Sequence, residues 1–100
     1  EKRALEKAAD PEPDGTRTQV YGMIKATLGS RRFSVACTDG LTRLGSCRGG
    51  MSRGGADWVA AGDWVLVSLR DYQRDKCDIL LRYDASEVRE LRTMGEIPTD

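Results

Sequence analysis

Short runs in which hydrophobic and polar residues alternate occur along most of the chain, and this period of two is typical of half-buried β-strands. A turn at Gly29-Ser30 separates the first two runs, and Asp39-Gly40 then supplies a dipeptide that favours a tight two-residue hairpin. The pattern predicts five strands, over Val20–Leu28, Arg32–Thr38, Leu41–Cys47, Trp64–Leu69 and Cys77–Tyr83.

Glycine and proline mark where these strands are interrupted or stop. Gly45 lies inside the third run, and we expect it to mark a bulge where the sheet bends. Residues 48–62 include two Gly-Gly pairs on either side of Arg53, which predicts a flexible basic loop. Residues 1–15 are highly charged and contain two prolines, so we expect a flexible segment with at most a short helical stretch.

A helix is predicted after the last strand. Asp84-Ala85-Ser86-Glu87 has the form of a capping box, and Gly95 and Pro98 end the helical pattern. Apolar residues recur every three positions at Ala85, Val88, Leu91 and Met94 and predict one stripe that packs on the sheet. The expected organisation is a charged segment over 1–15, a folded barrel over 16–83 and a helix over 84–97.

Five short strands joined by tight turns, with one longer connection, favour a closed barrel over an open sheet because closure removes exposed edges. The expected fold class is therefore all-β with a C-terminal helix: a five-stranded oligonucleotide-binding (OB) barrel with the helix packed on it. An SH3-like barrel has a similar number of strands and stays open as the structural alternative.

One hundred residues, 39% of them hydrophobic, form one small domain and exclude a multidomain enzyme. The formal net charge is zero, but residues 16–83 contain eleven Lys or Arg against six Asp, whereas both ends are net acidic. Nine of those eleven basic residues are arginines, whose planar guanidinium suits phosphate oxygens and base stacking. The charge distribution therefore favours a central nucleic-acid-binding surface, with a solvated mixed-charge surface as the alternative.

The residues offer little for catalysis or metal binding. There is no histidine, and Cys37, Cys47 and Cys77 form no C-x-x-C pair, so we expect buried reduced thiols, no metal, no cofactor and no enzymatic activity. The longest uncharged stretch has seven residues, against about twenty in a membrane-spanning helix. No signal-peptide pattern is present, and because the chain starts at Glu1 we expect a processed or truncated, intracellular protein.

The basic residues fall where an OB barrel binds nucleic acid, namely on its second and third strands and on the loops after the first and fourth strands. Trp58 closes the basic loop and is a candidate for base stacking or for the core. Trp64 is interpreted as structural and Phe33 as core, with base stacking by Phe33 as the alternative. The predicted RNA-contacting residues are Arg31, Arg32, Arg43, Arg48, Arg53, Trp58, Arg74 and Lys76.

The C-terminal third of the chain carries a run of residues that points to one family. The run is Leu69-Arg70-Asp71-Tyr72-Gln73, then Lys76, Asp78, Ile79-Leu80, Tyr83, Glu87, Arg89, Leu91 and Gly95-Glu96-Ile97-Pro98. Supporting matches are Leu28-Gly29, Cys37 with Asp39-Gly40, Arg43-Leu44, Arg48-Gly49 and Trp58-Val59. On these residues, over about positions 16–98, the chain resembles eukaryotic and archaeal translation initiation factor 1A.

The resemblance implies a non-enzymatic factor that binds the decoding A site of the small ribosomal subunit through its barrel, contacting ribosomal RNA. It also implies support of preinitiation complex assembly, scanning and start-codon selection, with small-subunit ribosomal proteins and translation initiation factors 1 and 5B as partners. We expect a cytoplasmic monomer. The chain departs from the family at residues 50–57, which carry one positive charge instead of a basic cluster, and it essentially lacks the family's two charged tails.

Two other functions stay open beside this one. The first is a generic single-stranded RNA-binding module of the cold-shock type, and the second is a protein-interaction barrel. Cold-shock modules depend on clustered surface aromatics, whereas this chain has six aromatic residues, several of them expected in the core. An interaction barrel would bind its partner with little dependence on salt.

Overall fold

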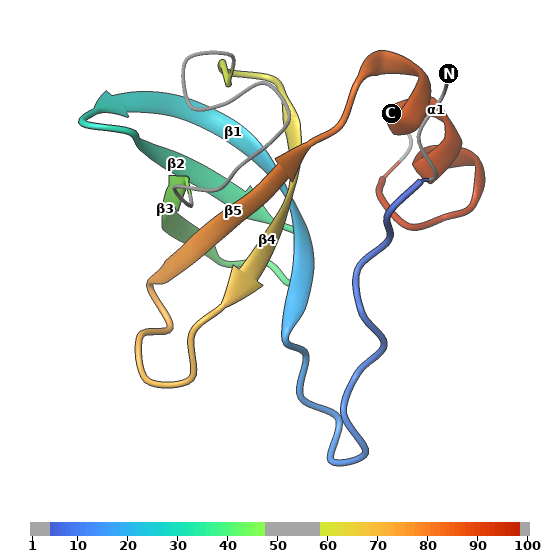
Figure 1. Ribbon diagram of the computed structural model, residues 1–100. Helices are drawn as coiled ribbons and strands as arrows, with labels where there is room; N and C mark the ends of the chain where they lie inside the picture. Colours follow the sequence, from blue (N-terminus) through green and yellow to red (C-terminus); the bar gives the residue numbers. More distant parts are fainter. Residues whose placement is uncertain (1–4, 48–58, 99–100) are drawn as a thin grey trace.

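The computed structural model describes residues 5–47 and 59–98, which form a closed five-stranded barrel with one helix beside it (Figure 1). Its elements are β1 (Gln19–Gly29), β2 (Arg32–Cys37), β3 (Thr42–Cys47), β4 (Trp64–Leu69), β5 (Lys76–Arg82) and α1 (Ala85–Thr93). The order around the barrel is β1-β2-β3-β5-β4, and β4 pairs with β1 to close it. Only the β3–β5 pair is parallel among these strands. The predicted fold, an OB barrel followed by a helix, is confirmed.

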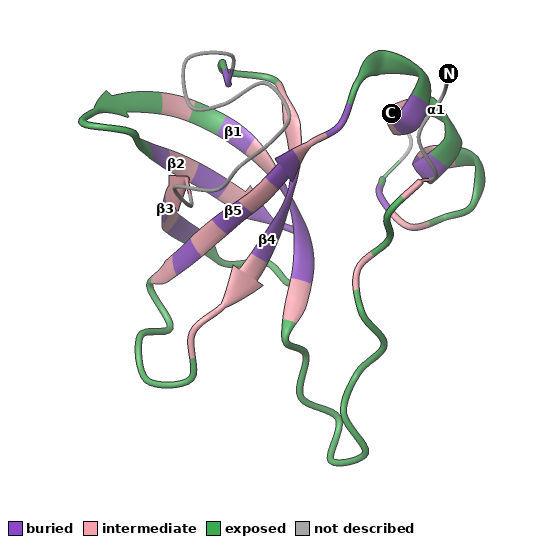
Figure 2. Cartoon of the chain, in the orientation of Figure 1, coloured by how far each residue is buried: buried purple, intermediate pink, exposed green. Residues whose placement is uncertain are grey.

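Two hydrophobic clusters stabilise this arrangement. The first fills the barrel with Val20, Ile24, Phe33, Val35, Cys37, Val59, Val65, Val67, Cys77 and Ile79. The second consists of Tyr21, Leu66, Leu81, Tyr83, Leu91 and Ile97, and it joins α1 to the outside of the barrel. Figure 2 shows these buried positions along the strands and on α1. Each fully buried aliphatic or aromatic side chain contributes about 1.5–3 kcal/mol.

The central part of β4 is buried on both faces, which explains its uninterrupted run of apolar residues. Val65 and Val67 belong to the cluster inside the barrel, whereas Leu66, between them, belongs to the cluster under the helix. Successive side chains of a strand point to opposite faces, so a strand covered on both sides needs no polar alternation. Phe33 is also buried, as predicted, and Trp64 is half-buried against the second cluster.

The capping box predicted at the start of α1 is present. The Asp84 carboxylate accepts a hydrogen bond from the Glu87 backbone N–H at 2.9 Å, and Glu87 Oε1 accepts one from the Asp84 N–H at 3.0 Å. At the other end, Gly95 has φ +78°, and the N–H groups of Gly95 and Glu96 bond back to carbonyls of the last turn. A left-handed residue at this position favours glycine, so both ends of the helix are encoded locally.

The apolar stripe predicted for α1 is narrower than the sequence indicated. Leu91 is fully buried and Val88 is half-buried, but Ala85 and Met94 are exposed. A step of three residues turns the helix by about 300°, so positions three apart drift by about 60° at each step. Ala85 and Met94 therefore end on opposite sides, and Ile97, beyond the helix, completes the cluster instead.

Gly45 does not mark a bulge, contrary to the expectation from the sequence. It lies in regular register, opposite Phe33 on β2 and Cys77 on β5. A Cβ atom at this position would lie 2.8 Å from Val35 Cγ2 and 3.3 Å from Ile79 Cδ1. Glycine is therefore required by the packing of the barrel interior. Among the described strands, the register shifts occur in the β1–β2 pair and in the β4–β5 pair.

The described part of the N-terminal segment, from Leu5 onward, lies beside the helix and the barrel (Figure 1). Leu5 and Ala8 contact the cluster under α1, and the Tyr83 hydroxyl donates a hydrogen bond to the Glu6 carbonyl. Residues 5–12 form neither helix nor strand. Where the sequence predicted only a flexible segment, the structure thus adds contacts between this segment and the second cluster.

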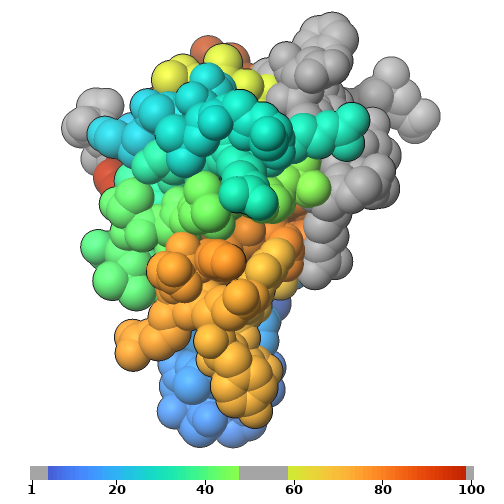
Figure 3. Space-filling model, turned by 90° about the vertical axis from the view of Figure 1, so that its left-hand side faces the viewer, coloured from blue at the N-terminus to red at the C-terminus, as the bar shows by residue number. Residues whose placement is uncertain are grey.

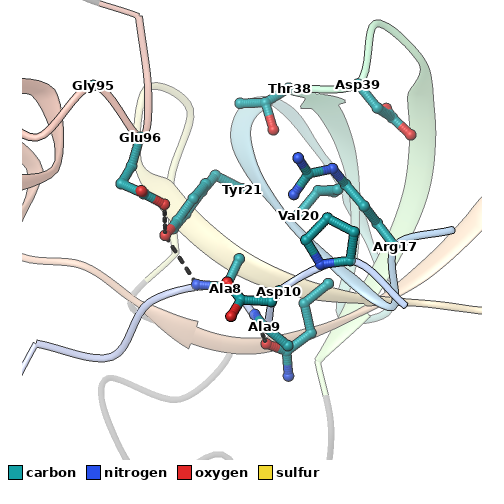
Figure 4. A pocket seen from close by; sticks show the side chains of 12 residues that line it. Ala8, Ala9, Asp10, Arg17, Val20, Tyr21, Thr38, Asp39, Gly95 and Glu96 are labelled. Atoms are coloured by element: carbon teal, nitrogen blue, oxygen red, sulfur yellow. Dashed lines mark hydrogen bonds between the residues drawn. The ribbon is translucent and has the colours of Figure 1, made fainter. Parts of the chain in front are cut away.

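Tyr21 joins the N-terminal segment to the chain that follows α1. Its hydroxyl accepts a hydrogen bond from the Ala8 N–H at 2.9 Å and donates one to Glu96 Oε1 at 2.7 Å (Figure 4). Burial of the ring, together with the nearby Glu96 carboxylate, raises the pKa of Tyr21 to about 12. These bonds border a polar cavity of about 390 Å³, with Arg17 and Asp39 across from Glu96. Residues of the N-terminal segment, of the barrel and of the chain after α1 therefore meet around this cavity.

Candidate nucleic-acid interface

The outward side chains of β2, β3 and β5 form one continuous face, which we call the barrel face. In this register Arg32 lies opposite Ser46, and Ser46 lies opposite Asp78. Lys76 is two residues before Asp78 on β5 and therefore points to the same side, while the intervening Cys77 points inward and is fully buried. Figure 3 shows this side of the molecule, with the β1–β2 turn, β3 and the β4–β5 loop all on the visible surface.

The β1–β2 turn presents two of the predicted arginines at one end of the barrel face. Arg31 and Arg32 are both exposed. Gly29, Ser30 and Arg31 have φ values of 79°, 52° and 61°, so three consecutive residues are in the left-handed region. Non-glycine residues adopt this region infrequently, and such strain is concentrated at functional sites. The two arginines also line a hollow of about 270 Å³ beside Phe33.

The β4–β5 loop presents the other predicted cations at the opposite end of the barrel face. Arg74 is exposed and Lys76 is half-buried where β5 begins. Neither these two nor Arg31 and Arg32 form an ion pair with a carboxylate among residues 5–47 and 59–98. Their charges are thus available to an anionic partner.

Three aspartates of β5 and the preceding loop reduce the positive charge of the barrel face. Asp78 is paired with Arg70, whose Nη2 donates to Asp78 Oδ1 at 2.7 Å, and Arg70 Nη1 also donates to Gln73. Asp71 and Asp75 are exposed in the loop. The barrel face is therefore moderately cationic, with its free guanidinium and ammonium groups at the two ends.

Tyr72 adds an exposed aromatic ring to the candidate interface. It is not among the predicted RNA-contacting residues, yet its side chain is 98% exposed at the β4–β5 loop, two residues from Arg74. A large aromatic ring held fully in water has no role in packing and is suited to stacking on a base. The signal in the sequence was an aromatic residue inside a charged turn, bounded by Asp71 and Gln73.

Arg43 was predicted to contact RNA, but the structure gives it an internal role. The residue is only 6% exposed, and its guanidinium donates to Asp39 Oδ1 and Oδ2 at 3.0 and 2.8 Å. Its Nε donates to the Arg74 carbonyl at 2.8 Å. The hydrogen-bonded guanidinium holds the pKa of the Asp39 carboxyl below its ordinary value. Arg43 therefore neutralises Asp39 and ties the turn after β2 to the β4–β5 loop instead of facing solvent.

Three other predicted contact residues, Arg48, Arg53 and Trp58, lie outside the described residues. Over 5–47 and 59–98, no group of three His, Cys, Asp or Glu side chains is arranged to hold a metal ion. Over the same residues, no helix is long and apolar enough to span a membrane.

Comparison with known proteins points to a single family. The family model for translation initiation factor 1A / IF-1 matches residues 7–100. The chain is 46% identical over 80 residues to eukaryotic translation initiation factor 1A of Triticum aestivum, covering 80% of this chain and 54% of that protein. The corresponding protein of Schizosaccharomyces pombe is 41% identical over 80 residues, covering 80% and 56%.

An archaeal relative and a solved structure complete the comparison. Translation initiation factor 1A of Sulfurisphaera tokodaii is 38% identical over 88 residues, covering 88% of this chain and 80% of that protein. The solution structure of translation initiation factor IF-1 from a Wolbachia endosymbiont of Brugia malayi superposes with a TM-score of 0.48 at 22% identity, covering 73% and 85%. The chain spans just over half the length of the eukaryotic relatives. With the family model matching nearly its whole length, the chain belongs to the translation initiation factor 1A / IF-1 family, whose members are non-enzymatic translation factors.

Proposed function

We propose that this chain binds the small ribosomal subunit at the decoding A site, with its barrel face against ribosomal RNA. In that position it supports preinitiation complex assembly, scanning and start-codon selection. The observation that carries the proposal is the exposure, on one face of a family barrel, of Arg31, Arg32, Arg74 and Tyr72 with Lys76 at its edge.

The chemistry of the barrel face suits a folded RNA. Guanidinium groups at its two ends reach phosphates of separate strands, and each phosphate contact releases condensed counterions. The hollow beside Phe33 and the ring of Tyr72 offer places for unstacked bases. Binding of this kind depends on shape and phosphate position more than on base sequence, as a factor that enters and leaves the subunit requires.

The expected partners besides ribosomal RNA are small-subunit ribosomal proteins and translation initiation factor 1. A contact with translation initiation factor 5B is also proposed, although the family makes it through a tail beyond the stretch seen here. The site of action would be the cytoplasm, and the chain would act as a monomer.

Reversing the charge of the β1–β2 turn tests the proposal. We expect the Arg31→Asp/Arg32→Asp variant to bind purified small ribosomal subunits about 10- to 100-fold more weakly than the unmodified chain at about 100 mM salt. The dependence of binding on salt should also become less steep, because fewer counterions are released. Both residues are exposed, so the melting temperature should stay unchanged. Subunit binding is measured by fluorescence anisotropy at several salt concentrations.

The matched control is Lys7→Asp/Arg89→Asp, which makes the same change in net charge at exposed positions on the N-terminal segment and α1. It should weaken binding much less than the turn variant. Equal weakening by both variants would mean that only overall charge matters, and an unchanged affinity of the turn variant would overturn the barrel face as the site. Equal affinity for subunits and for unstructured single-stranded RNA would instead favour the generic RNA-binding module.

Tyr72 is expected to contribute through stacking. The Tyr72→Ala variant should bind subunits roughly 5- to 150-fold more weakly, in line with about 1–3 kcal/mol for loss of a base–aromatic stack. Tyr72→Trp should keep most of the affinity because it keeps a π-face. Neither change should alter stability, since the ring is 98% exposed. Equal affinities of the Ala and Trp variants in the same anisotropy assay would exclude a stacking role.

A further inference from the structure

The β4–β5 loop, residues 70–75, carries two groups of the barrel face, Tyr72 and Arg74, and runs beyond the ends of its two strands (Figure 1). Both side chains are exposed, so packing does little to fix them. Ordering a mobile segment costs free energy at the moment of binding, and a segment that is already ordered avoids this cost. The contacts that hold the loop in the free protein therefore affect how tightly it binds.

The second half of the loop is attached to β3 through its backbone. The Arg74 carbonyl accepts a hydrogen bond from Arg43 Nε at 2.8 Å, and the Asp75 carbonyl accepts one from the Leu44 N–H at 2.8 Å. Both donors belong to β3. These two bonds do not reach the first half of the loop, which contains Tyr72.

A side-chain hydrogen bond closes the first half. Arg70 Nη1 donates to Gln73 Oε1 at 2.8 Å, and this bond spans a turn formed by Asp71 and Tyr72. The guanidinium is itself fixed by Asp78 on β5, to which Arg70 Nη2 and Nε donate at 2.7 and 3.3 Å. A planar guanidinium held at two nitrogens has the direction of its third nitrogen determined. We call Asp78, Arg70 and Gln73 together the Arg70 clamp.

The clamp also accounts for a carboxylate on a face that otherwise suits an anionic partner. Asp78 reduces the positive charge of the barrel face and so weakens the attraction of phosphates. Its two hydrogen bonds from Arg70 orient the guanidinium toward Gln73. The charge of Asp78 is therefore spent on ordering the loop.

We propose that Arg70 is a positioning residue of the barrel face: anchored on Asp78, it holds Gln73 and thereby the turn that presents Tyr72 to RNA, without contacting the RNA itself. The inference rests on the proposed function, which it deepens. A partner binds the free chains whose loop already has the competent arrangement, so the apparent affinity falls with the fraction of such chains. Breaking the clamp therefore weakens binding although no group that contacts RNA is removed.

The clamp is tested first in the free protein, by nitrogen-15 relaxation of the backbone amides. We expect the Tyr72 amide to have an order parameter above about 0.8 in the unmodified chain and below about 0.6 in Gln73→Leu, which removes the acceptor without changing the net charge. Gln73→Glu keeps an acceptor oxygen at the same reach and should keep the order parameter high. An order parameter that Gln73→Leu leaves unchanged would overturn the proposal.

The matched control is Gln19→Leu, which makes the same substitution at an amide whose Oε1 accepts from the Ala9 N–H at 2.9 Å. It should leave the order parameter of the Tyr72 amide unchanged. An equal fall in both variants would mean that the loop responds to any such change, and would also overturn the clamp. Circular dichroism checks that every variant is folded.

Binding to purified small ribosomal subunits then separates positioning from direct contact. Arg70→Lys and Gln73→Leu both keep the net charge, and each should bind about 2- to 10-fold more weakly, because the ammonium of lysine lacks the planar fork that reaches both partners. The double variant should bind no more weakly than either single variant, since one clamp is lost in all three. In a Tyr72→Ala background, Gln73→Leu should change the affinity less than about twofold.

Losses that multiply in the double variant, or a full effect of Gln73→Leu without the Tyr72 ring, would mean that these side chains contact RNA directly and would overturn the proposal. Unchanged affinity of Gln73→Leu, alongside weakened binding by the β1–β2 turn variant, would overturn only the role of Arg70. If the unmodified chain does not bind subunits, the proposed function fails and the role of Arg70 in it fails as well.

Discussion

Replacing Arg43 by methionine is expected to lower the free energy of unfolding by about 2–4 kcal/mol, and therefore the melting temperature by roughly 10–25 °C. The guanidinium is almost fully buried and makes three hydrogen bonds, to both Asp39 oxygens and to the Arg74 carbonyl. Its removal leaves a partly buried carboxylate and a backbone carbonyl without their donor, which costs more than the loss of one exposed ion pair. Urea unfolding at neutral pH measures the change.

The pH dependence of stability gives a second measurement of the same pair. Because Arg43 lowers the pKa of the Asp39 carboxyl in the folded protein, the pair stabilises the fold above the unfolded value of 3.8. This contribution is lost as the pH falls from that value through the lower folded pKa. The Arg43→Met variant should lose correspondingly less stability between about pH 5 and about pH 2 than the unmodified protein.

Arg70→Met is the matched control, because Arg70 and Asp78 form a second Arg–Asp pair with an N–O distance of 2.7 Å. The side chains of that pair are 37% and 21% exposed, whereas the Arg43 side chain is 5% exposed. The control should therefore lose less than about 1 kcal/mol. Equal losses in the two variants would contradict the conclusion that burial makes Arg43 structural.

Replacing Leu91 by alanine is expected to cost about 2–4 kcal/mol and to loosen α1 from the barrel. Leu91 is fully buried and belongs to the cluster that joins the helix, the outer side of β4 and the residues after the helix. The smaller side chain leaves a cavity at this junction. Hydrogen exchange should then speed up at the Ala8 amide, whose acceptor is the Tyr21 hydroxyl of the same cluster.

Arg89→Ala, on the exposed side of α1, is the control and should change stability by less than about 0.5 kcal/mol. Urea unfolding and hydrogen exchange are measured on both variants. A loss below about 1 kcal/mol for Leu91→Ala, with the Ala8 amide as protected as before, would mean that the helix adds little to the fold.

Local patterns in the sequence predicted most of the secondary structure, because each pattern acts within a few residues. Alternation predicted the five strands to within one or two residues at each end, and the capping box placed the N-cap of α1 at Asp84. The same patterns favoured a barrel and placed Arg31, Arg32, Arg74 and Lys76 at its turns. The sequence by itself therefore determined the elements, the class of fold and the family resemblance.

The tertiary structure decided which charged and polar side chains face the solvent. Arg43 looks like a surface residue in the sequence, but it shares the inward side of β3 with Gly45. Asp39 lies four residues before it, in the turn after β2, whereas only closure of the barrel brings the Arg74 carbonyl to it. Closure also places Cys37 and Cys77 in one hydrophobic cluster, and the loop between β4 and β5 holds Tyr72 in water. The contact between Arg43 and the Arg74 carbonyl joins residues 31 positions apart, and no period of two or three residues encodes it.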